Sequence, residues 1–286
     1  MRQRQDRQGS PYRFIEVEPI GGALGAEILN VDLSRPLSAE TVAEIHRAFI
    51  DHLVIFFRDQ DLQPGDLKAF ARHFGPLGTH GHLAGLEGHP EILPVVRKET
   101  DRHVFAEGWH ADVTYQDRPI LGALLYAVEV PPYGGDTLFA NQYLAYETLS
   151  EGLKKTLDGL VGVNTSAKAE ISRTREDRLR EAGAELKVLV GAHPVVRTHP
   201  ETGRRALYVN AAHTTHFQGW TIAESQPLLD YLFAHQVRPE FTCRFRWQPG
   251  SLAFWDNRCT QHNPINDYHG FRRVMHRVTL AGDVPQ

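Results

Sequence analysis

Two residues near the middle of the chain, His110 and Asp112, could together bind a metal ion. They lie two positions apart in the run Trp109-His-Ala-Asp-Val-Thr114, which is rich in residues that favour β-strands. In a strand, residues i and i+2 point to the same face, so both side chains could reach one point. An imidazole and a carboxylate are two of the three ligands in the 2-His-1-carboxylate triad of non-haem Fe(II). Because His-x-Asp pairs often occur by chance, a metal site needs further support.

The candidate third ligand is His262, which ends the run Ser251-Leu-Ala-Phe-Trp-Asp-Asn-Arg-Cys-Thr-Gln-His262. The chain has 16 histidines, so the residue type alone selects none of them. A competing residue, His269, lies in an Asp-Tyr-His-Gly sequence that is typical of a turn. Two others, His193 and His199, each precede a proline and are expected to have structural roles.

The run Phe271–Leu280 has the apolar and β-branched content of a strand. Its period of two places Arg273, Met275 and Arg277 on one face, and Arg272, Val274 and His276 on the other. Arginines on the inward face of an apolar strand are costly to bury unless each meets an anion. Two such arginines fit an enzyme that holds both 2-oxoglutarate and an acidic substrate, and His276 faces away from them.

Five motifs in this chain resemble those of the taurine dioxygenase family of Fe(II)/2-oxoglutarate-dependent oxygenases, which includes alkylsulfatases and aryloxyalkanoate dioxygenases. The similarity runs from about Phe14 to Pro285, and the motifs occur in the family's order. They are Trp-His-Ala-Asp (109–112), Gly-Gly-Asp-Thr (134–137), His-Pro-Val-Val-Arg-Thr-His-Pro (193–200), Trp-Asp-Asn-Arg-x-Thr-Gln-His (255–262) and Arg-Arg-Val-Met-His-Arg (272–277).

The resemblance implies a role for each matching residue around the metal. His110, Asp112 and His262 are the iron ligands and catalytic residues that it implies. It also implies that 2-oxoglutarate is the cosubstrate and that its distal carboxylate binds Arg273 and the hydroxyl of Thr137. A guanidinium group matches a carboxylate with two parallel hydrogen bonds, so this assignment is physically sound. The Gly-Gly-Asp-Thr segment also fits a plain hairpin turn in which Thr137 begins the next strand, and both interpretations can hold.

The substrate-binding residues that the resemblance implies are Arg277, His80 and the backbone amide of Val113. His82 competes with His80 because both lie in the same loop, rich in glycine and histidine. Taurine-specific members place a tyrosine and an asparagine around the substrate amine. This chain carries Leu83 and a residue near Ala106 instead. The resemblance therefore favours an alkyl sulfonate, an alkyl sulfate or an aryloxyalkanoate, with taurine itself as the alternative.

The implied reaction consumes O2 and 2-oxoglutarate, releases succinate and CO2, and hydroxylates the substrate. A product hydroxylated beside a sulfonate, a sulfate ester or an ether oxygen then fragments. Two other classes remain to be distinguished. A metal-dependent hydrolase needs a general base beside the metal and leaves Arg273 without a role. A non-catalytic barrel that binds a small anion or a partner protein has no use for open metal positions.

Length and composition set the class of protein. The chain has 286 residues, 41% of them hydrophobic and 23% charged, as in an ordinary globular protein. A net charge of −4 does not favour nucleic acid or an anionic membrane as partner. Two cysteines and an N-terminus without an apolar segment predict a cytoplasmic protein. We also expect a homo-oligomer, a dimer or a tetramer.

The helices and strands that must position these residues are predicted from hydrophobic periodicity and from the residues that begin or end helices and turns. We expect a disordered segment 1–11 and one domain over 12–286, which is mostly β with flanking helices. Ser38 and Pro64 begin two helices, and further helices are expected over 142–160 and 223–236. Strands are expected at 53–57, 92–96, 109–115, 121–130 and 136–140. Segment 164–190 is either a solvated helix or a lid over the site. The resemblance specifies a double-stranded β-helix, or jelly-roll, core.

Overall fold

The computed structural model describes residues 12–78, 84–103, 106–168 and 187–286. The predicted disordered segment 1–11 lies outside the described residues. So does most of the candidate lid, of which only 164–168 and 187–190 are described. These two ends meet on paired strands, because Thr165 lies opposite Val190 in an antiparallel ladder.

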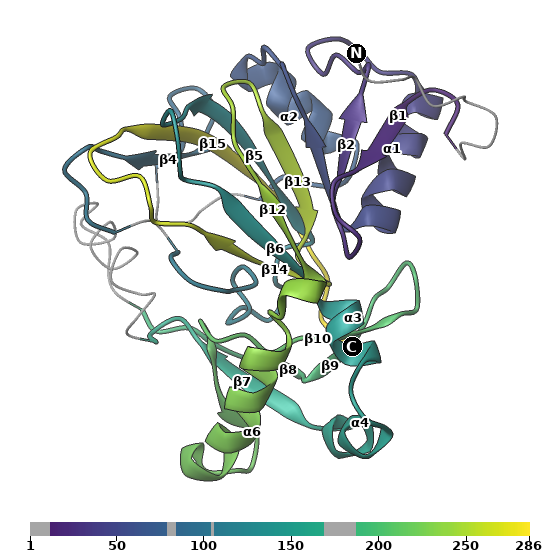
Figure 1. Ribbon diagram of the computed structural model, residues 1–286, viewed down its shortest axis with the longest axis vertical. Coiled ribbons are helices and arrows are strands. Elements are labelled where there is room, and N and C mark those ends of the chain that lie inside the picture. The colour runs from purple at the N-terminus through teal and green to yellow at the C-terminus, as the bar shows by residue number, and fades with distance from the viewer. Residues whose placement is uncertain (1–11, 79–83, 104–105, 169–186) are drawn as a thin grey trace.

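A seven-stranded sheet forms one wall of the structure (Figure 1). In sheet order its strands are β1 (Glu16–Pro19), β2 (Ala26–Leu29), β3 (Val54–Phe57), β13 (Leu252–Asp256), β5 (Gly122–Glu129), β15 (Arg273–Leu280) and β4 (Leu93–Arg97). All of these pairings are antiparallel except that of β2 with β3. The four residues of β3 and the five of β13 are all buried, as expected of strands covered on both faces.

A three-stranded sheet packs against this wall. It consists of β12 (Thr242–Phe245), β6 (Thr137–Asn141) and β14 (Thr260–Pro264), in that order. Successive strands along the chain change sheet: β5 is followed by β6 in the small sheet, and β12 to β15 alternate between the two. Such alternation between two facing sheets is that of a jelly roll. The predicted fold class, mostly β with a jelly-roll core and flanking helices, is confirmed.

Five further strands lie below this core in Figure 1. They are β7 (Val161–Thr165), β8 (Val190–Pro194), β9 (Val196–Thr198), β10 (Arg205–Leu207) and β11 (Thr214–Phe217). The order β11-β7-β8 makes a second three-stranded sheet, and β9 pairs with β10.

The helices flank the sheets, and their ends follow the capping residues. They are α1 (Ala39–His52), α2 (Pro64–Arg72), α3 (Gln142–Glu147), α4 (Glu151–Leu157), α6 (Ile222–His235) and the 3-10 turn Pro239–Phe241. Ser38 caps α1 by accepting the Thr41 N–H, and Pro64 occupies the first turn of α2, as predicted. The single helix expected over 142–160 is wrong. Ser150 is extended and caps a separate helix, α4, so the chain forms two short helices there.

Aromatic side chains fill the core on both sides of the main sheet. On one side Phe49 of α1 stacks on Phe254 of β13, with ring centroids 4.0 Å apart. On the other side Phe56 of β3 stacks on Phe245 of β12 at 3.9 Å, between the two facing sheets. Adjacent residues of β13 therefore serve different layers, since Phe254 faces the helices and Trp255 faces the barrel interior.

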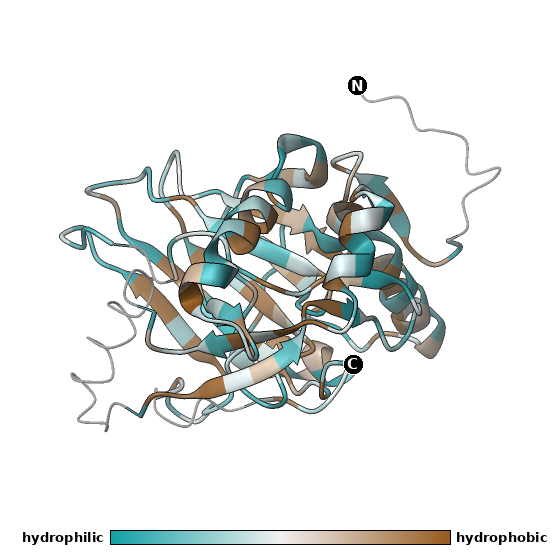
Figure 2. Cartoon of the chain, turned by 90° about the horizontal axis from the view of Figure 1, so that it is seen from below, coloured by the Kyte–Doolittle hydropathy of each residue, from teal (hydrophilic) through white to brown (hydrophobic). Residues whose placement is uncertain are grey.

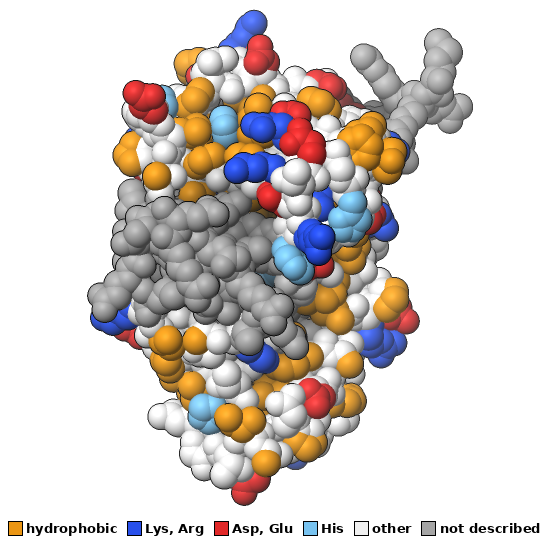
Figure 3. Space-filling model, turned by 90° about the vertical axis from the view of Figure 1, so that its left-hand side faces the viewer, with side chains coloured by type: hydrophobic (Ala, Val, Ile, Leu, Met, Phe, Trp, Pro, Cys, Tyr) orange, Lys and Arg blue, Asp and Glu red, His pale blue; other side chains and the backbone are white. Residues whose placement is uncertain are grey.

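The outer surface is mixed in character. Hydrophobic and hydrophilic residues alternate along the same helices (Figure 2), as expected of helices with one buried face. On the face shown in Figure 3, the side chains of Lys and Arg are interspersed with those of Asp and Glu. Among the described residues, no helix is both long and apolar enough to cross a membrane.

We predict that Phe254→Ala lowers the free energy of unfolding by about 3–5 kcal/mol, because it removes a fully buried ring and leaves a cavity. Urea denaturation followed by far-UV circular dichroism measures this loss. Phe14→Ala is the control: the Phe14 side chain is 55% exposed, so the change should stay within about 0.5 kcal/mol. Equal losses in the two variants would contradict the packing described here.

Candidate metal and cosubstrate site

His110 and Asp112 come from a tight turn, so the predicted strand over 109–115 is wrong. Only His110 makes a bridge: its N–H donates to His262 O at 3.0 Å and its carbonyl accepts from His262 N at 2.9 Å. After His110 the chain turns, with Val113 at φ 47° and Gln116 N donating to Val113 O. The two side chains converge because the backbone turns between them and because His110 lies beside β14.

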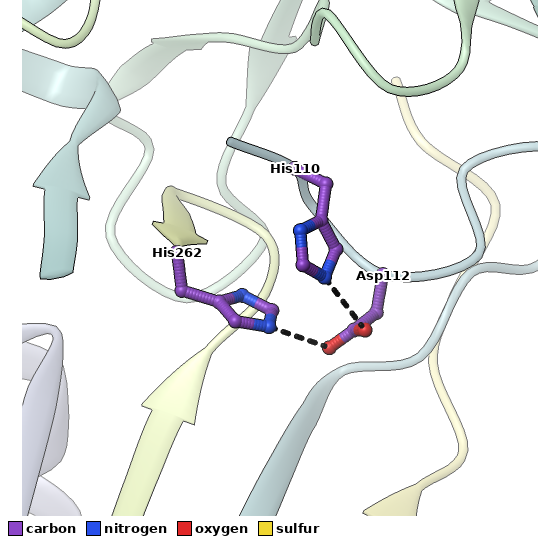
Figure 4. Close-up of side chains that lie close together, drawn as sticks. All are labelled: His110, Asp112 and His262. Carbon is purple, nitrogen blue, oxygen red and sulfur yellow. Dashed lines mark ion pairs between the residues drawn. The ribbon is translucent and has the colours of Figure 1, made fainter. Parts of the chain in front are cut away.

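The side chains of His110, Asp112 and His262 point toward one another (Figure 4). The Nε2 atom of His110 lies 3.7 Å from Asp112 Oδ1, and Nε2 of His262 lies 3.9 Å from Asp112 Oδ2. All three residues are buried. Two imidazoles and one carboxylate that meet at one point could hold a metal as a 2-His-1-carboxylate triad, and the structure brings these three residues together.

The protonation of these residues suits a metal. Nδ1 of His110 lies 2.9 Å from Gly108 O, an acceptor, so Nδ1 carries the proton and Nε2 offers its lone pair to the cluster. That Nε2 atom is buried and has no hydrogen-bond partner among the described residues. Burial lowers the pKa of His110 and of His262, which keeps both rings neutral at pH 7. The chain thus offers neutral imidazole nitrogens to a metal.

Asp112 is held ionised by its neighbours. Burial opposes its charge, but the neighbouring guanidinium of Arg277 holds the pKa of Asp112 below its ordinary value. Nη2 of Arg277 lies 2.6 Å from Asp112 Oδ2, and the two groups form an ion pair rather than a hydrogen bond. Arg277 therefore lies directly beside the candidate metal position.

The two arginines share one face of β15, as the sequence predicted. Arg273, Met275 and Arg277 are all buried, whereas Arg272 is exposed and His276 is half-buried. Nε and Nη2 of Arg273 have no hydrogen-bond partner among the described residues. A buried guanidinium with free donors is a ready site for a carboxylate.

Thr137 lies in the same pocket as Arg273 and begins β6, after a turn made by Gly134 and Gly135 at φ 73° and 70°. Trp247, which the sequence reasoning missed, donates its indole N–H to Thr137 Oγ1 at 3.0 Å. The ring of Trp247 also lies 5.5 Å from the guanidinium carbon of Arg273. The indole N–H of a buried tryptophan usually has an acceptor, and this is the only sequence signal that could have suggested the contact. Because Thr137 accepts this bond, its own hydroxyl proton can be donated to a ligand.

The rest of the described pocket wall is aliphatic or aromatic. Alongside His110, His262, Thr137 and the two arginines, the pocket is lined by Val95, Ala106, Leu125, Phe139, Trp255 and Pro264. Of the other predicted substrate contacts, Val113 lies in the turn after Asp112. His80, its competitor His82, and Leu83 all fall outside the described residues.

A second cluster, His199, Asp256 and Cys259, has metal-ligating side chains but is already satisfied. Arg258 binds both oxygens of Asp256, at 2.8 and 2.6 Å, and His199 Nε2 lies 3.0 Å from Oδ2. Burial raises the pKa of the Cys259 thiol, which disfavours a thiolate ligand. Asp256 and Arg258 thus form an internal ion pair, and the His199 ring contacts its carboxylate.

The fold and the site together define a non-haem iron oxygenase of the jelly-roll class. A family model described as "Taurine catabolism dioxygenase TauD, TfdA family" matches residues 16–279. The chain therefore belongs to the TauD/TfdA family of Fe(II)- and 2-oxoglutarate-dependent dioxygenases. It is an enzyme that uses Fe(II), 2-oxoglutarate and O2 on a small anionic organic substrate, as the resemblance implied.

Individual relatives cover almost the whole chain. An alpha-ketoglutarate-dependent sulfate ester dioxygenase from Pseudomonas putida is 38% identical, over 95% of this chain and 91% of the relative. An alkylsulfatase from Acinetobacter baylyi is 35% identical, over 96% and 87%. The crystal structure of a taurine dioxygenase from Burkholderia xenovorans superposes with a TM-score of 0.82 at 40% identity, over 96% of this chain and 91% of that one.

We predict that Arg258→Met destabilises the protein by roughly 3–5 kcal/mol at pH 7, because it leaves Asp256 buried without its main counter-charge. The Asp256 pKa is depressed in the folded state, so its ionised form stabilises the fold above its unfolded pKa of about 4. The difference in the free energy of unfolding between the wild-type protein and the variant should therefore become smaller as pH falls below that value. Urea denaturation at several pH values tests this. Arg35→Met, at an exposed ion pair, should change stability by at most about 0.5 kcal/mol.

Proposed function

We propose that His110, Asp112 and His262 hold Fe(II) and that Arg273 and Thr137 bind the distal carboxylate of 2-oxoglutarate. The observation that carries this proposal is the pairing of two features in one pocket. A buried triad offers an unpartnered imidazole nitrogen, and a buried arginine beside it has two free donor atoms. A hydrolase accounts for the first feature but leaves Arg273 with no ligand to bind.

The bound iron and 2-oxoglutarate supply the oxidation: O2, 2-oxoglutarate and a substrate C–H yield succinate, CO2 and a C–OH group. The chain's own residues bind and orient the reactants. Arg273 and Thr137 fix the far end of 2-oxoglutarate, while Arg277, beside Asp112, anchors the anionic head of the substrate. We propose that His80 and the amide of Val113 assist Arg277. Positioning of one C–H near the metal then decides which carbon reacts.

We infer that the substrate is an anion with an apolar body: an alkyl sulfate, an alkyl sulfonate or an aryloxyalkanoate. Among the described lining residues, those outside the triad, Thr137 and the two arginines carry no anionic side chain that could form an ion pair with an ammonium group. The names of the two relatives point to sulfate esters. Hydroxylation of the carbon that bears a sulfate gives an unstable product that releases sulfate and an aldehyde. Taurine remains the alternative, supported by the taurine dioxygenase of similar structure.

We further propose that residues 12–286 act as one domain, with a lid over 164–190, in a cytoplasmic homo-oligomer. Sedimentation velocity of the purified chain decides the subunit number: a single monomeric species at micromolar concentration would contradict the last of these proposals.

The reaction class is tested by measuring succinate release with different metal ions. With hexyl sulfate, O2 and 2-oxoglutarate, the enzyme should form succinate with Fe(II) and none with Zn(II). Asp112→Ala should abolish turnover, because the only carboxylate of the triad is lost. Sulfate release with Zn(II) in the absence of 2-oxoglutarate would instead support a hydrolase.

The two arginines should be separable by mutation. We predict that Arg273→Ala weakens 2-oxoglutarate binding by roughly 2–5 kcal/mol, since a buried carboxylate loses its partner. Trp247→Phe should cost less, about 0.5–1.5 kcal/mol, because it removes only one hydrogen bond to Thr137. Arg277→Ala should impair the prime substrate and uncouple 2-oxoglutarate decarboxylation from hydroxylation. Anaerobic calorimetry with 2-oxoglutarate and product stoichiometry measure the two effects. Identical 2-oxoglutarate defects in both arginine variants, with normal use of prime substrate, would contradict this division.

The substrate class can be tested by measuring kcat/KM along a series of alkyl sulfates of increasing chain length. Each methylene buried against the apolar wall is worth about 0.8 kcal/mol, or roughly fourfold in kcat/KM, until the pocket is full. We therefore expect kcat/KM to rise along the alkyl sulfates up to that limit and to exceed the value for taurine. The comparison is hexyl sulfate, hexanesulfonate and phenoxyacetate beside taurine. A clear preference for taurine would overturn the assignment of an apolar substrate body.

A further inference from the structure

Asn257 directly follows β13 and is fully buried. It lies in the Trp-Asp-Asn-Arg segment, whose neighbours Asp256 and Arg258 form the internal ion pair described above. The sequence reasoning assigned no function to it. The Asn257 side chain instead reaches the turn that carries Asp112, 145 residues earlier in the chain.

The amide of Asn257 binds both backbone groups of Asp112. Oδ1 of Asn257 accepts the Asp112 N–H at 2.7 Å, and Nδ2 donates to Asp112 O at 3.1 Å. Nδ2 also donates to Ile120 O at 3.3 Å. Asp112 thus receives from one side chain the two hydrogen bonds that a neighbouring strand would otherwise provide.

The turn held in this way has an unfavourable conformation. Val113 lies at φ 47°, in the left-handed region, which β-branched residues rarely adopt. Gln116 N donates to Val113 O at 2.9 Å and closes the turn. A strained backbone persists only where its surroundings determine it, and the Asn257 amide fixes the residue just before the strain.

Asn257 is itself held in place by the hydrogen bonds of its own segment. The Asn257 N–H donates to Leu121 O at 2.9 Å, and the Asp256 N–H donates to Leu53 O at 2.9 Å, at the start of β3. Arg258, bound to Asp256, also reaches Glu201 at 2.7 Å. Asn257 therefore presents its amide from a rigid point of the main sheet.

We propose that Asn257 is a positioning residue that aims the Asp112 carboxylate at the metal by holding the strained turn at Val113. This inference rests on the proposed metal site. It says that part of the metal affinity resides in a residue that does not touch the metal. A residue that only supported the fold would change stability without a matching change in metal affinity.

The test measures Mn(II) affinity of the purified full chain by electron paramagnetic resonance, together with thermal unfolding. Asn257→Ala should weaken Mn(II) binding about 10–100-fold, the range typical of residues that orient metal ligands. Asn141→Ala is the matched control. Asn141 is also a buried asparagine with three side-chain hydrogen bonds to backbone groups, but it caps α3. Its variant should lose stability and bind Mn(II) within about twofold of the wild-type protein.

A second substitution distinguishes an effect on the direction of the Asp112 carboxylate from an effect on the packing around Asn257. Glycine adopts a positive φ without steric cost, so Val113→Gly in the Asn257→Ala background should recover a large part of the lost Mn(II) affinity. The same glycine in the Asn141→Ala background should leave Mn(II) affinity unchanged. If Asn257→Ala fails to fold, Asn257→Ser, which cannot reach both backbone groups, takes its place in the same comparison.

Each outcome is decisive. Wild-type protein that does not bind Mn(II) contradicts the proposed metal site itself. Wild-type protein that binds Mn(II), with Asn257→Ala and Asn141→Ala equal in affinity, overturns the positioning role and leaves the metal site standing. A loss at Asn257 that Val113→Gly does not restore shows that the amide acts through packing and also contradicts the proposal.

Discussion

The structure depends on keeping charge inside an apolar barrel. Asp112, Arg273 and Arg277 are all buried between two sheets whose other contacts are largely aromatic and aliphatic. Removing such groups from water costs several kcal/mol each unless they are paired. Asp112 and Arg277 pair with each other at 2.6 Å, whereas Arg273 keeps two donor atoms without a partner among the described residues. That imbalance leaves buried positive charge with free donor atoms, which suits this interior to the binding of an anion.

The turn after β13 joins the fold to the site. Asp256 and Arg258 neutralise each other and attach this turn to His199 and Glu201. Asn257, between them, holds the backbone of Asp112, and Trp255 lines the pocket. One short segment therefore connects the main sheet, an internal ion pair and the candidate metal position. A change that destabilises the ion pair is expected to disturb Asp112 as well, because Asn257 lies between the two residues of the pair.

The sequence predicts those features that local rules determine. The faces of β15 follow from a period of two, and the cap at Ser38 follows from residue type, so both were correct. The strand expected over 109–115 was wrong because its β-forming residues are overruled by a distant side chain, Asn257, that takes the backbone hydrogen bonds of Asp112. The contact of Trp247 with Thr137 is likewise non-local, over 110 residues, and no spacing rule reveals it. His110, Asp112 and His262 were identified through motifs, and the structure supplied their geometry.

The most direct test of this account is the anomalous difference map of a crystal grown with Mn(II) and N-oxalylglycine, a stable mimic of 2-oxoglutarate. The account predicts one strong manganese peak among Nε2 of His110, Nε2 of His262 and the carboxylate of Asp112. It also predicts that the far carboxylate of N-oxalylglycine lies on Arg273 and Thr137. A manganese peak at His199, Asp256 and Cys259, or an N-oxalylglycine molecule that does not contact Arg273, would contradict it.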